Sequence, residues 1–402
     1  MEYVIRHIGD ICKKVCSGGT PTSSNMSYYE GGTIPWLNTN EVNFCNIYDT
    51  TKKITEEGLN NSAAKFIPEN SVIVAMYGVT AGKSAITKIP LTTNQACCNL
   101  IIDENQADYR YVYYFLQQQC DNLNKLANGG AQQNLNALII KRFKISLPNL
   151  KIQRKIASIL SAYDSLIENN TKRIRLLEQM AENLYKEWFV RFRFPGYENT
   201  EFVDGLPKGW KSYTIKELCS INQQTLNTKN KRNVIKYLDT GSITDNSIEN
   251  IEEYCVLEAP SRARRVVKEN SIIFSTVRPI LRHLGIMKDI PENLIVSTGF
   301  AVFDVREDIA NIVYMFLSSQ EVVKYCQMIA EGSVATYPSI KPEEIGRLRI
   351  SIPSMEIAIK WNAQLELIFL EKNKLQHQSA LLTRQRDLLL PRLMSGKLEV
   401  KA

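Results

Sequence analysis

Long apolar runs are missing from this chain of 402 residues. No hydrophobic stretch approaches the ~18 residues that a membrane-spanning helix requires. The first residues, Met1–Arg6, lack the apolar core of a signal peptide. Hydrophobic residues still make up 44% of the chain and charged residues 23%, which is typical of globular proteins. We expect a globular chain with no membrane partner, long enough for two or more domains.

Clustered metal ligands and paired cysteines are also missing. The nine cysteines include no Cys-x-x-Cys pair, and the three histidines, His7, His283 and His377, lie far apart in the sequence. These spacings argue against a disulfide framework and against a zinc site. They predict a protein without a metal, and unpaired cysteines favour the reducing cytoplasm as its location.

Patterns that carry catalysis are absent as well. No Gly-rich dinucleotide turn follows a predicted strand. No Ser/His/Asp set or paired carboxylate stands in a context that suggests chemistry. Three histidines leave little capacity for general-base catalysis. We therefore predict that the chain is not an enzyme and binds no cofactor itself.

Proline and glycine are absent between Pro148 and Pro195, so nothing breaks a helix there. Within this stretch one set of residues recurs every seven positions, and a second set follows each of them by four. The first set is Ile156, Tyr163, Asn170, Leu177 and Leu184. Such a two-position seam is typical of a coiled coil rather than of a globular surface helix. The stretch 151–194 therefore predicts one long helix, which at ~38 residues would span about 57 Å.

A second long helix repeats this pattern 205 residues later. Its seam residues are Trp361, Ile368, Leu375, Leu382 and Leu389. Lys372, Ser379 and Arg386 occupy the middle of its second seam position, so packing there should be less apolar. We expect this helix to run from about Ser354 until Pro391 stops it.

An internal duplication accounts for the match. Ile145–Pro148 corresponds to Ile350–Pro353 at the same offset of 205, and Glu69–Ser71 corresponds to Glu269–Ser271 at an offset of 200. The chain therefore predicts an α+β fold in which two globular mixed α/β domains are separated by two long coiled-coil helices. The predicted bounds are 1–150 and 195–353 for the globular domains, 151–194 for the first helix, and 354–402 for the second helix with its C-terminal tail.

Charge is spread along the chain without a dominant sign. The net charge of +7 is modest, both globular parts are near neutrality, and the excess lies on the helices. Proteins that coat nucleic acid non-specifically usually carry a dominant basic charge. Any contact with DNA must therefore rest on local clusters, and charge alone leaves the question open.

One turn in the first globular part is similar to a phosphate loop but departs from it. A strand predicted at Ser71–Tyr77 leads into Gly78–Ser84, where the first glycine stands one residue too late to wrap a phosphate. The next segment, Ala85–Pro90, is β-like where a helix should begin. Two interpretations remain, a tight turn between strands or a turn that presents groups to DNA. The candidates for DNA contact are Tyr77, Thr80, Gly82 and Lys83, with Asn38 at the end of an earlier strand.

A small amide-rich loop follows at Gly129–Asn134. Glutamine and asparagine bond bidentately to adenine, and glycine lets the backbone approach closely, although a polar surface turn has the same composition. The candidates are Gln132, Gln133 and Asn134.

Arginines flank the corresponding strand of the second copy, Ser271–Ser275, and a loop at Gly332–Tyr337 replaces the amide-rich one. Arginine bonds guanine and also clamps phosphate, although a solvated basic surface would look alike. The candidates are Arg262, Arg264, Arg278, Arg282, His283, Ser333 and Tyr337.

The order of these parts resembles the specificity subunit of a type I restriction–modification system along the whole chain. The matching stretches are Ser17–Pro21, Ile34–Trp36, Leu147–Pro148, Gln153–Ile156, Leu206–Trp210, Ile352–Pro353 and Leu389–Leu398. One departure is that the first domain lacks its own Leu-Pro-x-Gly-Trp opening. The chain also lacks the Asn/Asp-Pro-Pro-aromatic motif of adenine methylation.

The resemblance implies two target-recognition domains and two helices that pack antiparallel. It implies a double-stranded DNA target with two different half-sites and an unread spacer set by the helices. The implied partners are two copies of a modification (adenine methyltransferase) subunit and restriction/translocase subunits, and S-adenosylmethionine, ATP and Mg²⁺ are expected only on those partners. Asn170 on the seam should fix the helix register, unless it is a hydrated fraying point. The alternative function is a coiled-coil interaction scaffold that does not read DNA.

Overall fold

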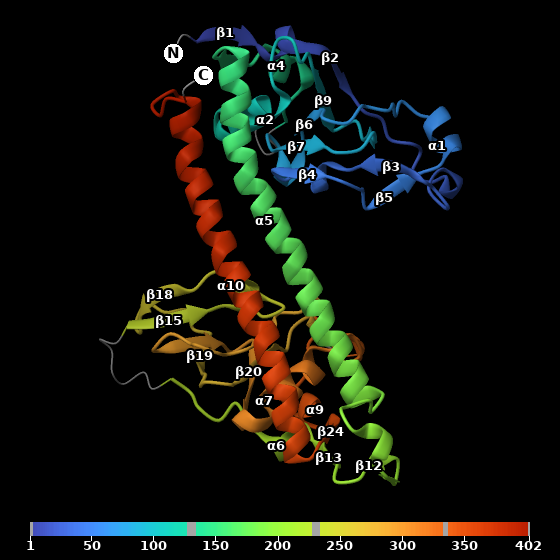
Figure 1. The fold of residues 1–402 in the computed structure, drawn as a ribbon, viewed down its shortest axis with the longest axis vertical. Coiled ribbons are helices and arrows are strands. Elements are labelled where there is room, and N and C mark those ends of the chain that lie inside the picture. Colours follow the sequence, from blue (N-terminus) through green and yellow to red (C-terminus); the bar gives the residue numbers. More distant parts are fainter. Residues whose placement is uncertain (1–2, 127–133, 227–233, 333–336, 401–402) are drawn as a thin grey trace. The chain divides into compact units, whose positions relative to one another are not determined.

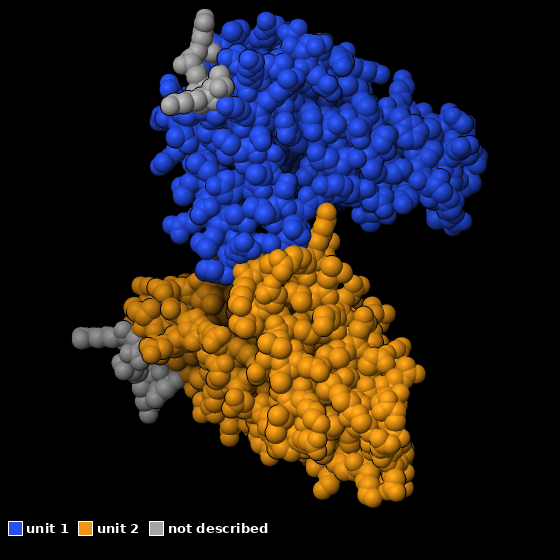
Figure 2. Space-filling view, in the orientation of Figure 1, with its two compact units in different colours: residues 1–171, 376–402 blue, residues 172–375 orange. Residues whose placement is uncertain are grey.

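The structure is a computed structural model that describes residues 3–126, 134–226, 234–332 and 337–400. The chain divides into two compact units (Figure 2). Unit 1 comprises residues 1–171 and 376–402, and unit 2 comprises residues 172–375. Each unit therefore joins one globular part to a segment of each long helix.

Unit 1 contains two main sheets (Figure 1). The five-stranded sheet has the order β2-β9-β6-β7-β4 and the three-stranded sheet the order β5-β3-β8. Their strands are β2 Cys12–Ser17, β3 Ile34–Leu37, β4 Cys45–Ile47, β5 Lys52–Ile54, β6 Val72–Ala75, β7 Ser84–Thr87, β8 Thr92–Thr93 and β9 Cys97–Ile102. The other elements are the strand pair β1 Val4–His7 and β10 Lys144–Leu147, and helices α1 Glu56–Asn60, α2 Tyr109–Gln118, α3 Cys120–Asn124 and α4 Ala137–Arg142.

Helix α2 begins at a capping carboxylate and buries one aromatic-rich face. The Asp108 side chain accepts hydrogen bonds from the backbone N–H groups of Arg110, at 2.9 Å, and Tyr111, at 3.3 Å. Tyr111 and Leu116 are fully buried in a core that also includes strands β6 and β9 and the first turns of the first long helix. The aromatic face of α2 therefore belongs to the core of unit 1.

Unit 2 also contains two main sheets, but the strands are divided between them differently. Its four-stranded sheets have the orders β14-β23-β20-β21 and β18-β15-β22-β19. Their strands are β14 Cys219–Ile221, β15 Val234–Leu238, β18 Glu252–Cys255, β19 Ala263–Val266, β20 Ile272–Ser275, β21 Leu284–Ile286, β22 Leu294–Ser297 and β23 Phe300–Val305. The strand pairs are β11 Phe202–Val203 with β12 Leu206–Pro207, β13 Lys211–Thr214 with β24 Arg349–Ile352, and β16 Ile243–Thr244 with β17 Ser247–Ile248. The short helices are α6 Ile215–Leu218, α7 Glu307–Ser318, α8 Gln320–Glu331 and α9 Pro342–Gly346.

Matching backbone bonds confirm the duplication. β3 pairs β8 in parallel in unit 1, and β15 pairs β22 in parallel in unit 2. The N–H of Leu135 donates to the carbonyl of Met76 at 3.0 Å, and the N–H of Ile340 donates to the carbonyl of Thr276 at 2.8 Å. These two bonds join residues whose counterparts are offset by 200 on one side and by 205 on the other, as the sequence comparison predicts.

The long helices are α5, Leu150–Tyr185, and α10, Met355–Met394 (Figure 1). They pack antiparallel within each unit. In unit 1, residues 164 and 170 of α5 bond to residues 386 and 379 of α10, so the numbers run in opposite directions. In unit 2, residue 185 contacts residue 361 while residue 178 contacts residue 372. The predicted α+β class with two antiparallel coiled-coil helices is confirmed.

All ten predicted seam residues are buried or half-buried. Ile156 and Trp361 are fully buried, and Asn170 is only 4% exposed. The Asn170 side-chain amide donates to the Gln378 Oε1 at 3.1 Å and to the Ser379 Oγ at 3.2 Å. Its burial and its bonds to α10 exclude a fraying point and are those of a register-fixing residue.

The polar residues predicted in the second seam each have a partner on α5. Arg386 pairs with Asp164 at 2.6 Å, and Lys372 pairs with Glu178 at 2.6 Å. The Tyr114 hydroxyl of α2 donates to the same Asp164 carboxylate at 2.5 Å, which ties the globular part of unit 1 to both helices. Burial raises the pKa of Tyr114, and the charge of Asp164 raises it further.

The ends of the long helices differ from the prediction. α10 does not stop at Pro391 but continues through it to Met394. Pro391 lies only three residues before the end of α10, and the helix loses one backbone hydrogen bond there. The buried residues Leu390, Leu393 and Met394 hold the last turn in the core of unit 1. The α-helical part of α5 ends at Tyr185 and continues as a π-helical turn, Lys186–Val190, in which Trp188 and Phe189 are buried.

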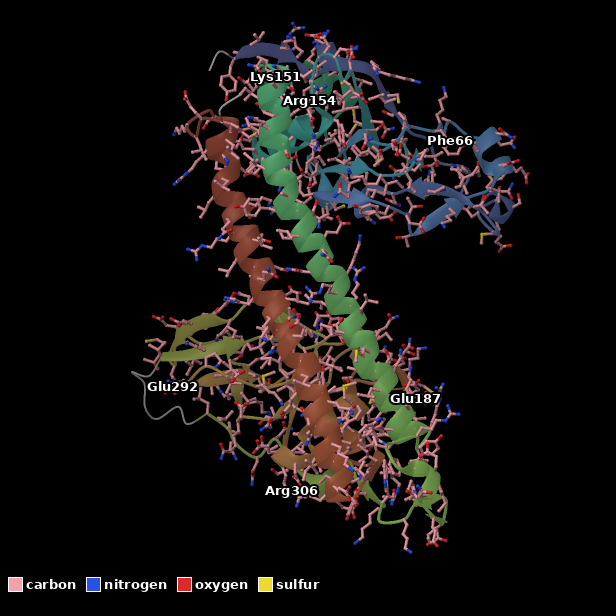
Figure 3. All side chains as sticks on the ribbon, viewed as in Figure 1. Phe66, Lys151, Arg154, Glu187, Glu292 and Arg306 are labelled. Atoms are coloured by element: carbon pink, nitrogen blue, oxygen red, sulfur yellow. The ribbon has the colours of Figure 1, made fainter. Side chains whose placement is uncertain are left out.

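Ion pairs at the surface accompany this π-helical turn. Glu187, labelled in Figure 3, pairs with Arg191 and lies 3.5 Å from the Arg193 guanidinium.

Within the described ranges, no helix is both long enough and apolar enough to cross a membrane.

Candidate nucleic-acid interface

The Gly-Lys segment of unit 1 is a tight turn between two strands. A short 3-10 turn, Gly78–Thr80, joins β6 to its antiparallel neighbour β7. Gly78 and Gly82 have φ values of +78° and +77°, in the left-handed region where glycine is favoured. A phosphate loop would require a helix after the lysine. Strand β7 takes that place, so the structure excludes a phosphate loop.

The candidates in this turn have different surroundings. The Thr80 hydroxyl is buried and donates to the Thr39 carbonyl at 2.9 Å, and the N–H of Gly82 donates to Ala75 at 2.9 Å. Both residues therefore shape the turn. The Lys83 Nζ donates to the Asn43 Oδ1 at 2.8 Å and is half-buried. Tyr77 is exposed at the start of the turn.

Val79 is exposed at the tip of the turn and was missed by the sequence analysis. Its side chain is 92% exposed, the highest value among the exposed large hydrophobic residues of the described chain. Valine methyl groups can contact the methyl group of thymine. The signal in the sequence was an apolar residue between turn glycines, which alone does not tell a tip from a core position.

Asn38 lies beside this turn and is engaged within the protein. It follows β3 and caps a short 3-10 turn by accepting a hydrogen bond from the Asn40 N–H at 3.4 Å. The same side-chain oxygen also accepts from the Asn94 amide at 3.4 Å. The next residue, Thr39, receives the hydrogen bond from Thr80. Asn38 is half-buried, so its amide supports the neighbouring loop.

Asn134, the one residue of the amide-rich loop that the structure describes, lies next to the same turn. Asn134 is exposed, and the bond from Leu135 to Met76 places it beside Tyr77. Gln132 and Gln133 lie outside the described residues. The two unit 1 segments predicted to contact DNA therefore converge through Tyr77 and Asn134.

The same two segments converge in unit 2. A 3-10 turn, Pro279–Leu281, joins β20 to β21, and Val277 forms a β-bridge with Ser339. Tyr337 is 58% exposed, and its ring lies 5.2 Å from the Arg278 guanidinium. Ser333 lies outside the described residues. Arg278 and Tyr337, predicted from separate motifs, therefore form one exposed pair.

Two other candidates in this turn are engaged inside unit 2. The Arg282 Nε donates to the Asp245 carboxylate at 2.5 Å, and its Nη2 donates to the Ser318 carbonyl at 2.9 Å. The His283 Nδ1 lies 2.7 Å from the Ile243 carbonyl, which can only accept. Both side chains are half-buried and hold the turn against its neighbours.

The remaining arginines belong to a different sheet. Arg262 is exposed just before β19, and Arg264 lies in β19 with its Nη1 donating to the Ala263 carbonyl at 2.8 Å. The turn that carries Arg278 instead joins β20 and β21 of the other sheet. The structure therefore does not place these two arginines in the turn with Arg278.

Each unit thus presents a turn and a neighbouring segment whose exposed groups can contact base edges. The exposed groups include an amide, an aromatic ring and an apolar tip in unit 1. In unit 2 they include a guanidinium, an aromatic ring and the apolar side chains of Ile280 and Leu281. Among the residues that the structure describes, no cluster of three or more His, Cys, Asp or Glu side chains could hold a metal.

The long helices carry a second exposed surface. Large apolar side chains protrude from both helices in each unit. They are Ile159, Leu166, Leu381 and Leu388 in unit 1, and Leu176, Met180, Met355, Ile359, Leu367 and Leu370 in unit 2. Exposed apolar stripes of this kind commonly mark protein interaction sites.

Comparison with known proteins identifies one family along the chain. The model of the type I restriction modification DNA specificity domain matches residues 1–179 and 207–376. The chain is 27% identical over 419 residues to the type I restriction enzyme MjaIX specificity subunit of Methanocaldococcus jannaschii, covering 100% of this chain and 94% of that protein. It is 28% identical over 200 residues to the EcoR124I/EcoR124II specificity subunit of Escherichia coli, covering 48% and 49% of the two chains.

A solved structure shares the fold. The crystal structure of the type I restriction–modification S subunit from M. genitalium aligns with a TM-score of 0.62 at 16% identity, covering 98% of this chain and 96% of that one. The family match covers both repeats and reaches into both long helices. The chain therefore belongs to the type I restriction–modification DNA specificity family.

Proposed function

We propose that the chain is the DNA sequence-recognition subunit of a type I restriction–modification complex, and that each unit reads one half-site of a bipartite target. The observation that carries this proposal is the repeated turn. Both units place a β-turn and the segment before a long helix side by side, through the bonds Leu135 to Met76 and Ile340 to Thr276. The frame is the same, so the differing side chains on it can specify different bases.

The two half-sites should differ in sequence. Unit 1 offers Tyr77, Val79 and Asn134, whereas unit 2 offers Arg278 and Tyr337. Asparagine pairs with adenine, valine contacts thymine methyl, and arginine pairs with guanine. A symmetric protein would read a palindrome, but this chain repeats its backbone and not its reading side chains.

The helices are suited to set an unread spacer. α5 has 36 residues and α10 has 40. At ~1.5 Å per residue these lengths are about 54 Å and 60 Å, which exceeds the ~34–36 Å between half-sites on one face of DNA. The buried bonds of Asn170 and the Arg386–Asp164 pair favour one register, and hence one spacer.

The partners follow from the exposed apolar stripes on the helices. Each unit carries at least four such side chains spread over both helices, so two docking surfaces suit two copies of a modification subunit. We propose that those subunits carry S-adenosylmethionine and methylate adenine, and that restriction/translocase subunits bind ATP and Mg²⁺. In this proposal the chain supplies recognition only, and it works in the cytoplasm, where the DNA lies.

Methylation of a random DNA library by the chain together with its modification subunit tests the proposal. The expected product is a bipartite motif, with two short clusters of fixed bases at one spacing. Methylation or binding without any sequence preference would contradict the proposal and favour a coiled-coil scaffold that does not read DNA.

A further inference from the structure

The turn after β20 has a backbone that its sequence does not favour. Arg278 and Arg282 have φ values of +46° and +57°, in the left-handed region that side chains other than glycine rarely occupy. Their counterparts at an offset of 200 are Gly78 and Gly82, at +78° and +77°. The turn therefore has the same backbone conformation in both units. In unit 2 two arginines occupy positions that favour glycine, so the backbone there is strained.

Arg282 has a structural explanation for this strain. Its guanidinium bonds to Asp245 and to the Ser318 carbonyl, which joins the turn to the end of α7. The backbone carbonyl of Asp245 in turn lies 3.4 Å from the Lys372 Nζ on the helix seam. Arg282 is therefore a positioning residue that holds the turn from behind.

Arg278 has no comparable structural role. Its side chain is exposed, and among the described residues no carboxylate forms an ion pair with it. Its guanidinium instead lies over the Tyr337 ring, at 5.2 Å from the ring centre. A cation that stacks on an exposed ring while facing solvent is available to a ligand.

The surroundings hold this guanidinium in place before any ligand arrives. The N–H of Arg278 donates to the Pro338 carbonyl at 2.9 Å, next to the stacking ring. The N–H of Ile280 donates to the Gln327 side chain of α8 at 3.1 Å. A stacked, planar fork of donors loses less freedom when it forms two parallel hydrogen bonds.

We propose that Arg278 specifies a guanine in the half-site of unit 2, by donating two hydrogen bonds to its O6 and N7, and that Tyr337 positions the guanidinium. This inference rests on the proposed function and adds the base that this turn requires. Gly78 stands at the same place in unit 1 and has no side chain. The half-site of unit 1 therefore has no guanine read by an arginine at the corresponding position.

The test compares methylation motifs of the complete complex with its modification subunit on a random DNA library. Arg278→Gly copies the residue of unit 1 and removes backbone strain, so the variant should fold. Preference for G·C at one base pair of one half-site should fall by about 10- to 100-fold, with every other position unchanged. Arg306→Gln, which changes an exposed arginine of the same unit just before α7, is the matched control and should leave the motif intact.

Two variants of Tyr337 separate positioning from folding. Tyr337→Phe keeps the ring and should keep the motif, whereas Tyr337→Ala should relax the same base pair as Arg278→Gly, but by a smaller factor. A merely structural role would weaken the whole half-site in Tyr337→Ala instead.

Two results would overturn the inference while leaving the proposed function intact. One is a bipartite motif that Arg278→Gly does not change. The other is uniform weakening at all positions with a shallower salt dependence, which is the behaviour of a phosphate contact. A wild-type complex without any motif would instead refute the proposed function itself.

Discussion

The two units solve one packing problem with different chemistry. In unit 1, Asp164 of α5 pairs with Arg386 of α10 and accepts a hydrogen bond from Tyr114. The positions offset by 205 in unit 2 are Phe369 and Ala181, and Phe369 packs edge-on against Tyr314 of α7 at 6.0 Å. In both units a tyrosine from the globular part meets the same place on the helix pair. The packing of each globular part on the helix pair thus requires a buried contact with this tyrosine. Polar partners supply that contact in unit 1, and an aromatic partner supplies it in unit 2.

The ends of the helix pair show the same contrast. Trp361, Trp188 and Phe189 form an aromatic cluster in unit 2. Their counterparts in unit 1 are the aliphatic residues Ile156, Leu393 and Met394. Burial is equal at both ends, but the aromatic end buries larger side chains and should lose more when one of them is truncated.

Truncation at this seam should have the largest effect. Trp361→Ala should lower the unfolding free energy of unit 2 by about 3–5 kcal/mol, because the side chain is fully buried among three rings. Ile156→Ala, the matched change in unit 1, should cost about 2–4 kcal/mol. Urea unfolding followed by hydrogen exchange in each unit measures both. A smaller loss of unfolding free energy for Trp361→Ala than for Ile156→Ala would contradict the proposed difference between the two ends of the helix pair.

Removing one partner of the polar contact should have the next largest effect. The Arg386 and Asp164 side chains are 16% and 19% exposed, so solvent screens the pair only partly. Arg386→Ala should cost about 2–4 kcal/mol, because it leaves a mostly buried carboxylate without its cation.

The double variant Arg386→Ala with Asp164→Phe copies unit 2 and should recover much of that loss. Thermal unfolding of both single variants and the double variant gives the coupling between them. A double variant as unstable as the sum of the two single losses would mean that the two contacts are not interchangeable.

The next prediction concerns DNA reading by unit 1. Lys83→Ala should weaken or relax only the half-site of unit 1, by about 1–3 kcal/mol if the lysine contacts a base. Binding to targets altered in one half-site at a time measures this. Equal weakening of both half-sites would contradict the assignment of one unit to one half-site.

The smallest effect on stability is expected at Asn170. Asn170→Leu should change the unfolding free energy by less than about 1 kcal/mol or raise it, because a buried amide favours a single register at a cost in stability. Its effect should appear as a mixture of spacers in the methylation motif. A single unchanged spacer would show that other contacts, such as Arg386 with Asp164, suffice to fix the register.

The sequence predicted the two long helices and the internal repeat better than it predicted the roles of the residues in the candidate interface. Seven-residue periodicity located both helix seams, because the repeat of a buried face is a local property. The turn at Gly78–Lys83 was likewise recognisable from its glycines. The positive φ values of Arg278 and Arg282 in unit 2 were harder to predict, because arginine does not indicate a turn. The offset of 200 nevertheless aligns these arginines with Gly78 and Gly82.

The roles of individual site residues depend on distant partners. Arg282 and His283 bond to Asp245 and Ile243, which lie about forty residues earlier in the chain. Nothing local in the sequence indicates that these two side chains are already engaged and that Arg278 is not. The exposure of Val79 likewise depends on contacts of its turn with distant residues, such as the hydrogen bond from Thr80 to Thr39.

The most direct test of the account is a paired deletion in the helices. Removing residues 171–177 of α5 and 371–377 of α10 takes one heptad from each helix, keeps Asn170 with Gln378 and Ser379, and leaves the seams facing each other. Each helix should shorten by about 10 Å, which corresponds to roughly three base pairs. Sequencing of methylated DNA should then show the same two half-sites with a spacer shorter by about three base pairs, or no methylation at all. The original motif with its original spacer would contradict the claim that the helix pair sets the distance between two independent half-sites.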